Sequence, residues 1–240
     1  MLEIRFRELV PHVYHLDFDN QYDLAMNFLR YQEYYESPKW HKEIFRLVDY
    51  MEWYAKNQCG LKNKKGRPAR MFSYPADWSG FNIPRWAMEE VFPRIEDWNK
   101  YDDFMQTVFK LIVADEDEHP FYLIGTYGGG AIGPNDSEDE SILDHEMAHA
   151  FYYTDKEYRA AVDLLLAQWY HDQGHAGEEL DSAKEVLKLM GYHKDIITDE
   201  IHAYCATGLC DELKGVISQK ERTSFQILFK EIKKKCTPER

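Results

Sequence analysis

Two histidines stand four residues apart at positions 145 and 149, and a glutamate directly follows the first of them. In an α-helix, residues at this spacing project from the same side about one turn apart, so His145 and His149 can present nitrogens to one metal ion. Glu146 would point sideways, towards a water held on the metal, where it can act as a general base. The segment His145-Glu146-Met147-Ala148-His149 therefore predicts a hydrolytic site with Zn²⁺ as its cofactor.

The residues around this HExxH segment indicate that it is an active-site motif and not a chance occurrence of the pattern. The bare pattern would arise in about 4% of shuffled chains of this composition. Flanking and internal positions are apolar, as a buried active-site helix requires, and this lowers the chance by a further factor of roughly 0.02. The apolar positions are Leu143, Met147, Ala148, Ala150 and Phe151. A helix that carries two incidental histidines is therefore the disfavoured alternative.

The segment from Ile142 to Phe151 resembles the active-site helix of the zincin metallopeptidases. The strand expected over Phe121–Tyr127 fits the same resemblance, because in zincins an edge strand near that helix typically aligns the peptide substrate. The resemblance covers about residues 120–213 and is silent on the first 110 residues. It implies a zincin-like catalytic core, with a small sheet packed on the HExxH helix, that hydrolyses peptide bonds.

A hydrolytic zinc site commonly takes three protein ligands and leaves a fourth position for water. Metzincins place a glycine and a histidine shortly after the motif, but Tyr152 and Asp155 stand there, which excludes that subclass. Peptide deformylases need an upstream cysteine ligand, and no cysteine lies between Cys59 and His145. The third ligand must therefore come from elsewhere.

Glu200 is the expected third ligand. The segment Thr198-Asp199-Glu200-Ile201-His202-Ala203-Tyr204 resembles the glutamate helix of gluzincins, where the glutamate binds zinc and a small residue three positions later lets two helices pack closely. Ala203 fills the small position. The chain departs from that family at Tyr204, where gluzincins often place an aspartate that orients a zinc-binding histidine. Asp144 or Asp199 could take this orienting role.

Two alternatives to Glu200 stay open in the sequence. His202 lies about 200° around the helix from Glu200, so only one of them can face the metal. His171 and His175 form a pair on an expected loop nearer to the motif. A donor for the oxyanion of the tetrahedral intermediate is also expected, and the candidates are Tyr127, Tyr152, Tyr153 and Tyr204.

The elements that must position these residues indicate an α+β fold that is predominantly helical. Residues 1–114 form an aromatic-rich helical N-terminal part, which could be integral to the same domain, and residues 115–240 form the catalytic part. The acidic turn at 115–118 is the expected boundary. The loop Asp77–Pro84 has the turn residues of an ordered segment and could border a binding cleft. Aromatic stripes on the first two helices are typical of a core, with an aromatic substrate groove as the minority interpretation.

Periodicity and turn residues give the expected bounds of each element. Strands are expected at His12–Phe18, Arg70–Tyr74 and Phe121–Tyr127, the last ending at Gly128-Gly129-Gly130. Helices are expected at Gln21–Glu36, Trp40–Asn57, Glu96–Val113, Glu140–Tyr153, Lys156–Tyr170, Glu178–Met190, Thr198–Leu213 and Ser218–Lys235.

Composition narrows the environment and the partners. The chain has 43 acidic and 29 basic residues, a formal charge of −14, which argues against nucleic acid as a partner. The one basic cluster, at residues 62–67, is interpreted as a solvated loop. No stretch approaches the ~20 apolar residues of a membrane span, and the N-terminus has no secretory signal. Four cysteines without CxxC spacing are expected to be free thiols, so the expected location is the cytoplasm.

The sequence thus predicts a zinc metallopeptidase that acts on a peptide or protein substrate. His145, His149 and Glu200 would hold Zn²⁺, and Glu146 would activate water. One alternative is a zinc hydrolase of a non-peptide amide or ester, since nothing in the sequence fixes the substrate. The other is a non-catalytic zinc-containing binding protein, which has no need for the base Glu146.

Overall fold

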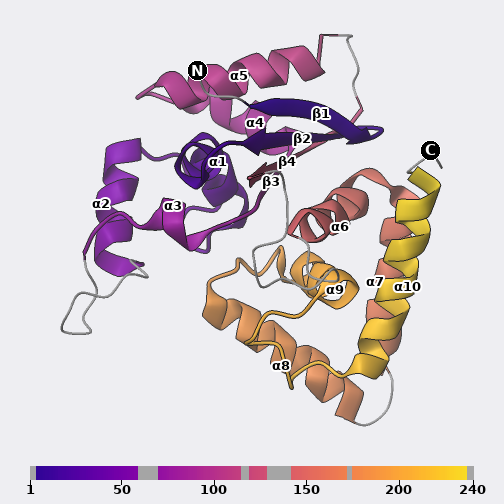
Figure 1. The fold of residues 1–240 in the computed structure, drawn as a ribbon. Coiled ribbons are helices and arrows are strands. Elements are labelled where there is room, and N and C mark those ends of the chain that lie inside the picture. The colour runs from indigo at the N-terminus through magenta and orange to yellow at the C-terminus, as the bar shows by residue number, and fades with distance from the viewer. Residues whose placement is uncertain (1–3, 59–69, 115–118, 129–141, 172–174, 237–240) are drawn as a thin grey trace.

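The computed structural model describes residues 4–58, 70–114, 119–128, 142–171 and 175–236. Within these residues, the fold is α+β, with one four-stranded mixed sheet between two groups of helices (Figure 1). The first elements are β1 (Arg5–Val10), β2 (Val13–Phe18), α1 (Gln21–Glu36), α2 (Leu47–Asn57), α3 (Tyr74–Asp77), β3 (Phe81–Pro84), α4 (Arg85–Val91), the short 3₁₀ helix η1 (Phe92–Arg94) and α5 (Lys100–Ile112). They are followed by β4 (Tyr122–Tyr127), α6 (Ile142–Thr154), α7 (Lys156–His171), α8 (His175–Met190), α9 (Ile197–Thr207) and α10 (Gln219–Cys236).

The sheet has the strand order β1-β2-β4-β3. β4 runs parallel to β2 and antiparallel to β3, with Val13 opposite Tyr122 and Phe81 opposite Gly125. Strands from before and after the expected boundary therefore share one sheet, while the boundary turn itself, 115–118, lies outside the described residues. The expectation that Phe121–Tyr127 forms an edge strand is wrong, because β4 is interior and β3 lies at the edge.

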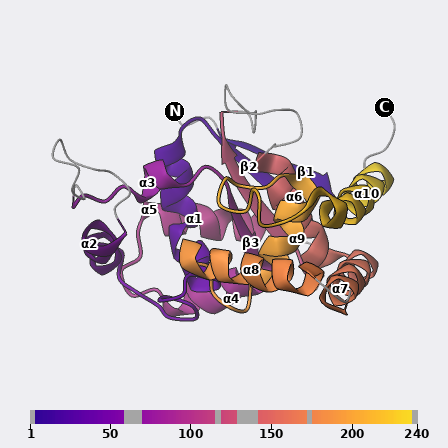
Figure 2. The ribbon, with the colours of Figure 1, turned by 90° about the horizontal axis from the view of Figure 1, so that it is seen from below.

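Side chains alternate between the two faces of β4, as the period of two in a strand requires. Tyr122 and Ile124 pack with the helices α6 to α10, whereas Leu123 packs with α1, α4 and α5. Gly125 lets α1 lie close to the sheet, since a Cβ there would come within 2.5 Å of the Phe28 ring. Figure 2 shows the result from below, with α2 at one end of the molecule and α7 and α10 at the other.

Three elements expected in the N-terminal part are either absent or have different bounds in the structure. No strand forms at Arg70–Tyr74; instead α3 begins at Tyr74, with Pro75 in its first turn, where the missing N–H costs nothing. The helix expected from Trp40 begins at Leu47, because Lys42 has a φ of 59° that a right-handed helix cannot continue. The helix expected from Glu96 begins at Lys100, after the capping residue Asn99.

The other differences are smaller. Thr198–Leu213 is helical only to Thr207, because the backbone of Gly208 is extended. β1, β3 and α4 are present although the sequence did not predict them. Cys205, Cys210 and Cys236 are free thiols, as expected. None of the helices in the described residues is long and apolar enough to cross a membrane. Cys59, the basic cluster 62–67, Gly129, Gly130 and the expected start of the motif helix at Glu140 lie outside the described residues.

Candidate metal centre

The motif helix α6 packs directly against α9, which carries Glu200. Small side chains permit this close approach. Ala148 and Ala150 on α6 are fully buried, and so is Ala203 on α9, where the resemblance to the gluzincin glutamate helix implies a small residue. This contact between the helices brings His145 and His149 of α6 next to the Glu200 carboxylate of α9.

His145, His149 and Glu200 meet at one point. The two Nε2 atoms lie 3.2 Å apart, and Glu200 places one carboxylate oxygen 3.6 Å from His149 Nε2 and the other 3.8 Å from His145 Nε2. Ligand atoms on a tetrahedral zinc stand about 3.3 Å apart, since the bonds are about 2.0–2.1 Å long. The spacing of the three groups therefore fits one zinc ion.

Glu200 provides a second sign that a cation belongs here. Its side chain is almost fully buried, and its Oε2 atom has no hydrogen-bond partner among the described residues. A buried carboxylate oxygen without a partner destabilises the fold, because it loses its hydration and gains no hydrogen bond in return. A metal ion at this oxygen would remove that cost, so the residues present fit Zn²⁺.

Glu146 is held beside this group by a short chain of hydrogen bonds. Asn82 on β3 donates from Nδ2 to Glu146 Oε2 at 2.7 Å, and the Tyr122 hydroxyl on β4 donates to Asn82 Oδ1 at 2.5 Å. Gly80 lies against the same carboxylate, where a Cβ would approach Glu146 Oε1 to 2.5 Å. Burial raises the pKa of Glu146, against the opposing effect of His145 and His149, which suits a group that takes up a proton.

Asp199 orients His149 from behind. Its carboxylate lies 3.0 Å from His149 Nδ1 and 3.3 Å from His202 Nδ1. Burial alone would raise the pKa of Asp199, but the two histidines beside it lower that pKa to about 2, so it is an anion. An N–H on Nδ1 of His149 leaves the lone pair of Nε2 free for a metal. Asp144, the other candidate for this role, instead forms an ion pair with Lys233 on α10 at 2.5 Å.

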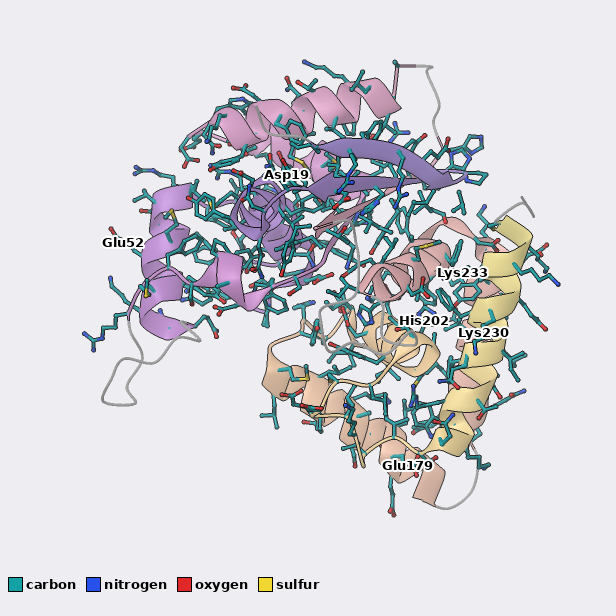
Figure 3. The ribbon with its side chains drawn as sticks, in the orientation of Figure 1. Asp19, Glu52, Glu179, His202, Lys230 and Lys233 are labelled. Atoms are coloured by element: carbon teal, nitrogen blue, oxygen red, sulfur yellow. The ribbon has the colours of Figure 1, made fainter. Side chains whose placement is uncertain are left out.

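The alternative third ligands lie elsewhere. His202 is fully buried on the far side of α9, with Nε2 2.8 Å from the Tyr158 hydroxyl (Figure 3). His171 is exposed at the end of α7 and borders a separate cavity beside Trp169 and Phe225. The side chain of His175 lies outside the described residues. Of the candidates that the structure describes, only Glu200 joins the two motif histidines.

Among the four candidate oxyanion donors, only Tyr204 lines the cleft at this centre. Its ring lies 4.7 Å from that of His145, and its hydroxyl is 3.1 Å from the hydroxyl of Tyr192. Tyr152 donates instead to Asp163, and Tyr153 packs on Tyr122. Tyr127 packs in the cluster around α1.

The cleft has a volume of about 260 Å³ and takes residues from both parts of the chain. Part of the expected loop Asp77–Pro84 borders it, namely Asp77, Trp78, Ser79, Gly80 and Asn82. Other lining residues were not predicted from the sequence, because they reach the cleft only through tertiary packing: Gln32, Glu36, Tyr192 and Thr207. The outer edge of β3 is closed at one point, because Gln32 Oε1 accepts from the Asn82 N–H at 3.1 Å.

A second group of possible metal ligands, His41, His193 and Asp195, lies on the surface. The imidazoles stack with centroids 3.9 Å apart, and Asp195 is exposed. Burial and the neighbouring His41 and lysines lower the pKa of His193. Of the two groups among the described residues, only the one at His145 lies beside a buried carboxylate in a cleft.

Comparison with known proteins returned no matching family model, no matching curated protein and no matching solved structure. The function is therefore inferred from the chemistry of this centre.

Proposed function

We propose that the protein is a zinc metallopeptidase with a zincin-like, gluzincin-type centre. The observation that carries the proposal is the convergence of His145, His149 and Glu200 at zinc-ligand spacing beside the buried carboxylate of Glu146. Two of these ligands and the carboxylate come from one turn of α6, and the third comes from α9. A structural zinc site would have no use for the fourth group.

Each residue then has a chemical role. When bound, Zn²⁺ supplies Lewis acidity that polarises the substrate carbonyl and makes water more acidic. Glu146 takes the proton from the attacking water and returns it to the leaving amine. Asn82 holds one oxygen of Glu146 and leaves the other for that proton. The Tyr204 hydroxyl, which lies on the cleft, would donate to the developing oxyanion.

The substrate would lie between β3 and the side of the cleft that Tyr192 and Tyr204 line. In this proposal β3 takes the place of the zincin edge strand, since it borders the cleft and contacts α6. Its Asn82 N–H is already bonded to Gln32, and Pro84 has none to offer. Side chains of the cleft, more than the backbone of β3, would therefore position the peptide.

Metal removal tests the proposal directly. We expect the purified protein to contain one zinc per chain and to cleave a mixed peptide library. We expect 1,10-phenanthroline to abolish cleavage and added Zn²⁺ to restore it, with elemental analysis as the parallel readout. Full peptidase activity in zinc-free protein would overturn the proposal. Hydrolysis of amide or ester probes without any peptide cleavage would replace it with the non-peptide alternative.

The ligand set is tested by Glu200→Ala, with His171→Ala as the matched control. Loss of a direct ligand should lower zinc affinity by more than the roughly 10–100-fold that follows loss of an outer-shell partner. The control should bind zinc as the wild type does. If Glu200→Ala binds zinc with the affinity of the wild type, Glu200 is not a zinc ligand.

Asp199→Asn should weaken zinc binding without removing a ligand. An amide cannot supply the negative charge that holds His149 and makes it more basic, so we expect a loss of about 10–100-fold in zinc affinity. Competition with a chelator of known affinity would measure it. Asp144→Asn is the control, since Asp144 pairs with Lys233 and should leave the zinc affinity unchanged. Equal losses in both variants would contradict the orienting role of Asp199.

A further inference from the structure

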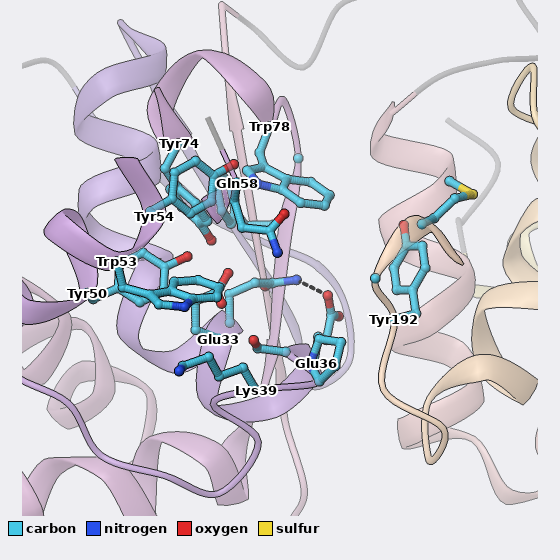
Figure 4. Close-up of a pocket in the computed structure, with 17 residues that line it drawn as sticks. Glu33, Glu36, Lys39, Tyr50, Trp53, Tyr54, Gln58, Tyr74, Trp78 and Tyr192 are labelled. Carbon is cyan, nitrogen blue, oxygen red and sulfur yellow. Dashed lines mark hydrogen bonds between the residues drawn. The ribbon is translucent and has the colours of Figure 1, made fainter. Parts of the chain in front are cut away.

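A second cavity adjoins the metal cleft. Figure 4 shows the residues that line it. Its volume is about 150 Å³, far above the roughly 10–15 Å³ that one water requires. Glu36, Trp78 and Tyr192 line both spaces, so a molecule held at the metal centre can extend into the cavity. The cavity is therefore placed to receive a group that flanks the reacting bond.

Aromatic side chains form one wall of this cavity. Figure 4 shows Tyr50, Trp53, Tyr54 and Tyr74 gathered on one side, with Tyr192 opposite them. Aromatic faces attract cations through their quadrupole, by about 0.5–2 kcal/mol for each well-placed ring.

The same wall already attracts one cation of the chain. The exposed Lys39 lies at the cavity, and its Nζ atom is 5.3 Å from the centre of the Trp53 ring.

The charged groups of the cavity are mainly acidic. Its charged side chains among the described residues are the carboxylates Glu33 and Glu36, and the ammonium of Lys39. Glu33 lies among the aromatic rings, next to the hydroxyls of Tyr50 and Tyr74. Burial raises the pKa of Glu33 to about 7, an effect that those hydroxyls oppose. A cation in the cavity would stabilise the ionised carboxylate, whereas an apolar group would leave it without a counter-ion.

We propose that this cavity is a specificity subsite for a substrate residue with an ammonium or guanidinium side chain, next to the bond cleaved at the metal centre. Glu33 pairs with the cation, and Trp53, Tyr54 and Tyr74 surround its alkyl stem and charge. This inference rests on the proposed peptidase function for the identity of the substrate, but binding of a cation in the cavity can be measured without catalysis.

Peptide pairs that differ only in lysine or norleucine beside the scissile bond test the subsite. We expect the wild type to prefer the lysine peptide by about tenfold or more in kcat/KM, as expected for a hydrogen bond between charged groups. In Glu33→Gln the preference for lysine over norleucine should fall to near unity. Glu43→Gln, at an exposed position, is the matched control and should keep the wild-type preference. Glu33→Asp, which keeps the charge, should retain part of it.

Direct binding separates failure of the subsite from failure of the peptidase. Trp53 and Trp78 line the cavity, so tryptophan fluorescence should change on titration with n-butylammonium and much less with n-butanol. Glu33→Gln should abolish the difference, with thermal melting as the check that the variant is folded. A wild type that cleaves peptides without preferring lysine would overturn the subsite alone. If no peptide is cleaved, selective n-butylammonium binding supports the cation site, and equal binding of both probes refutes it.

Discussion

Glu146→Gln should lose peptidase activity and keep its zinc. The amide oxygen of the substituted side chain can still accept the hydrogen bond from Asn82, so the local packing should survive. An amide cannot take a proton from water, and general-base catalysis is worth on the order of 10²–10⁴-fold. We expect kcat to fall by about 10³-fold, measured on the best peptide from the library, with the zinc content unchanged.

The control for this variant is the same chemical change at a distant carboxylate. Glu157→Gln, on the exposed first turn of α7, should leave both activity and zinc content at wild-type levels. Full activity in Glu146→Gln would exclude Glu146 as the base. Loss of zinc together with activity would show that Glu146 supports the metal instead, and the proposed division of roles would be wrong.

Gly80→Ala adds a single methyl group and should reduce activity, because that group would collide with the Glu146 side chain. A Cβ at this position would stand 2.5 Å from Glu146 Oε1 and 2.6 Å from Ile142 Cγ2. Both distances are far inside van der Waals contact, so the carboxylate, the loop or the start of α6 must move. A shift of about 1 Å in a reacting group can cost on the order of 10²-fold in rate, which is the expected fall in kcat/KM.

Zinc binding separates this effect from general damage. Because Gly80 touches the base and not the metal ligands, zinc affinity should stay near the wild-type value. Ser79→Ala changes the neighbouring residue without adding volume and should be close to wild type in both measurements. Unchanged kcat/KM in Gly80→Ala would mean that the position of Glu146 set by Gly80 and Asn82 does not matter for the rate.

The parts of the site that the sequence could predict lie on single helices: spacing predicted the motif on α6, and a resemblance to the gluzincin glutamate helix predicted Glu200 and Ala203. His145, Glu146 and His149 lie within two turns of α6, and Glu200 and Ala203 lie one turn apart on α9. Helical periodicity alone places such residues on defined faces. The structure brings the two faces together at ligand spacing, while zinc binding itself stays a prediction.

The parts that the sequence did not predict depend on contacts between distant segments. Asn82 reaches Glu146 only because β3 pairs with β4, and β3 is too short and too uniformly buried to show an alternating pattern. Glu36 looks like the last residue of an amphipathic helix, yet it lines the cleft. The aromatic stripes are core, as expected, since Tyr50 and Tyr54 are buried in one hydrophobic cluster. That both also line the cavity beside Glu33 could not be read from helical spacing.

The interior position of β4 has a consequence for the order in which the molecule can assemble. β2 and β3 are translated before β4, yet in the described sheet neither contacts the other except through it. A nascent chain that ends before Tyr122 has a β1–β2 hairpin and a separate β3 but no strand to join them. The parallel pairing of β2 with β4 spans about a hundred residues, which makes it a slow, late step. Pairing of β4 with β3 brings the Tyr122 hydroxyl to Asn82, so this support of the Glu146 carboxylate forms only after β4 has joined the sheet.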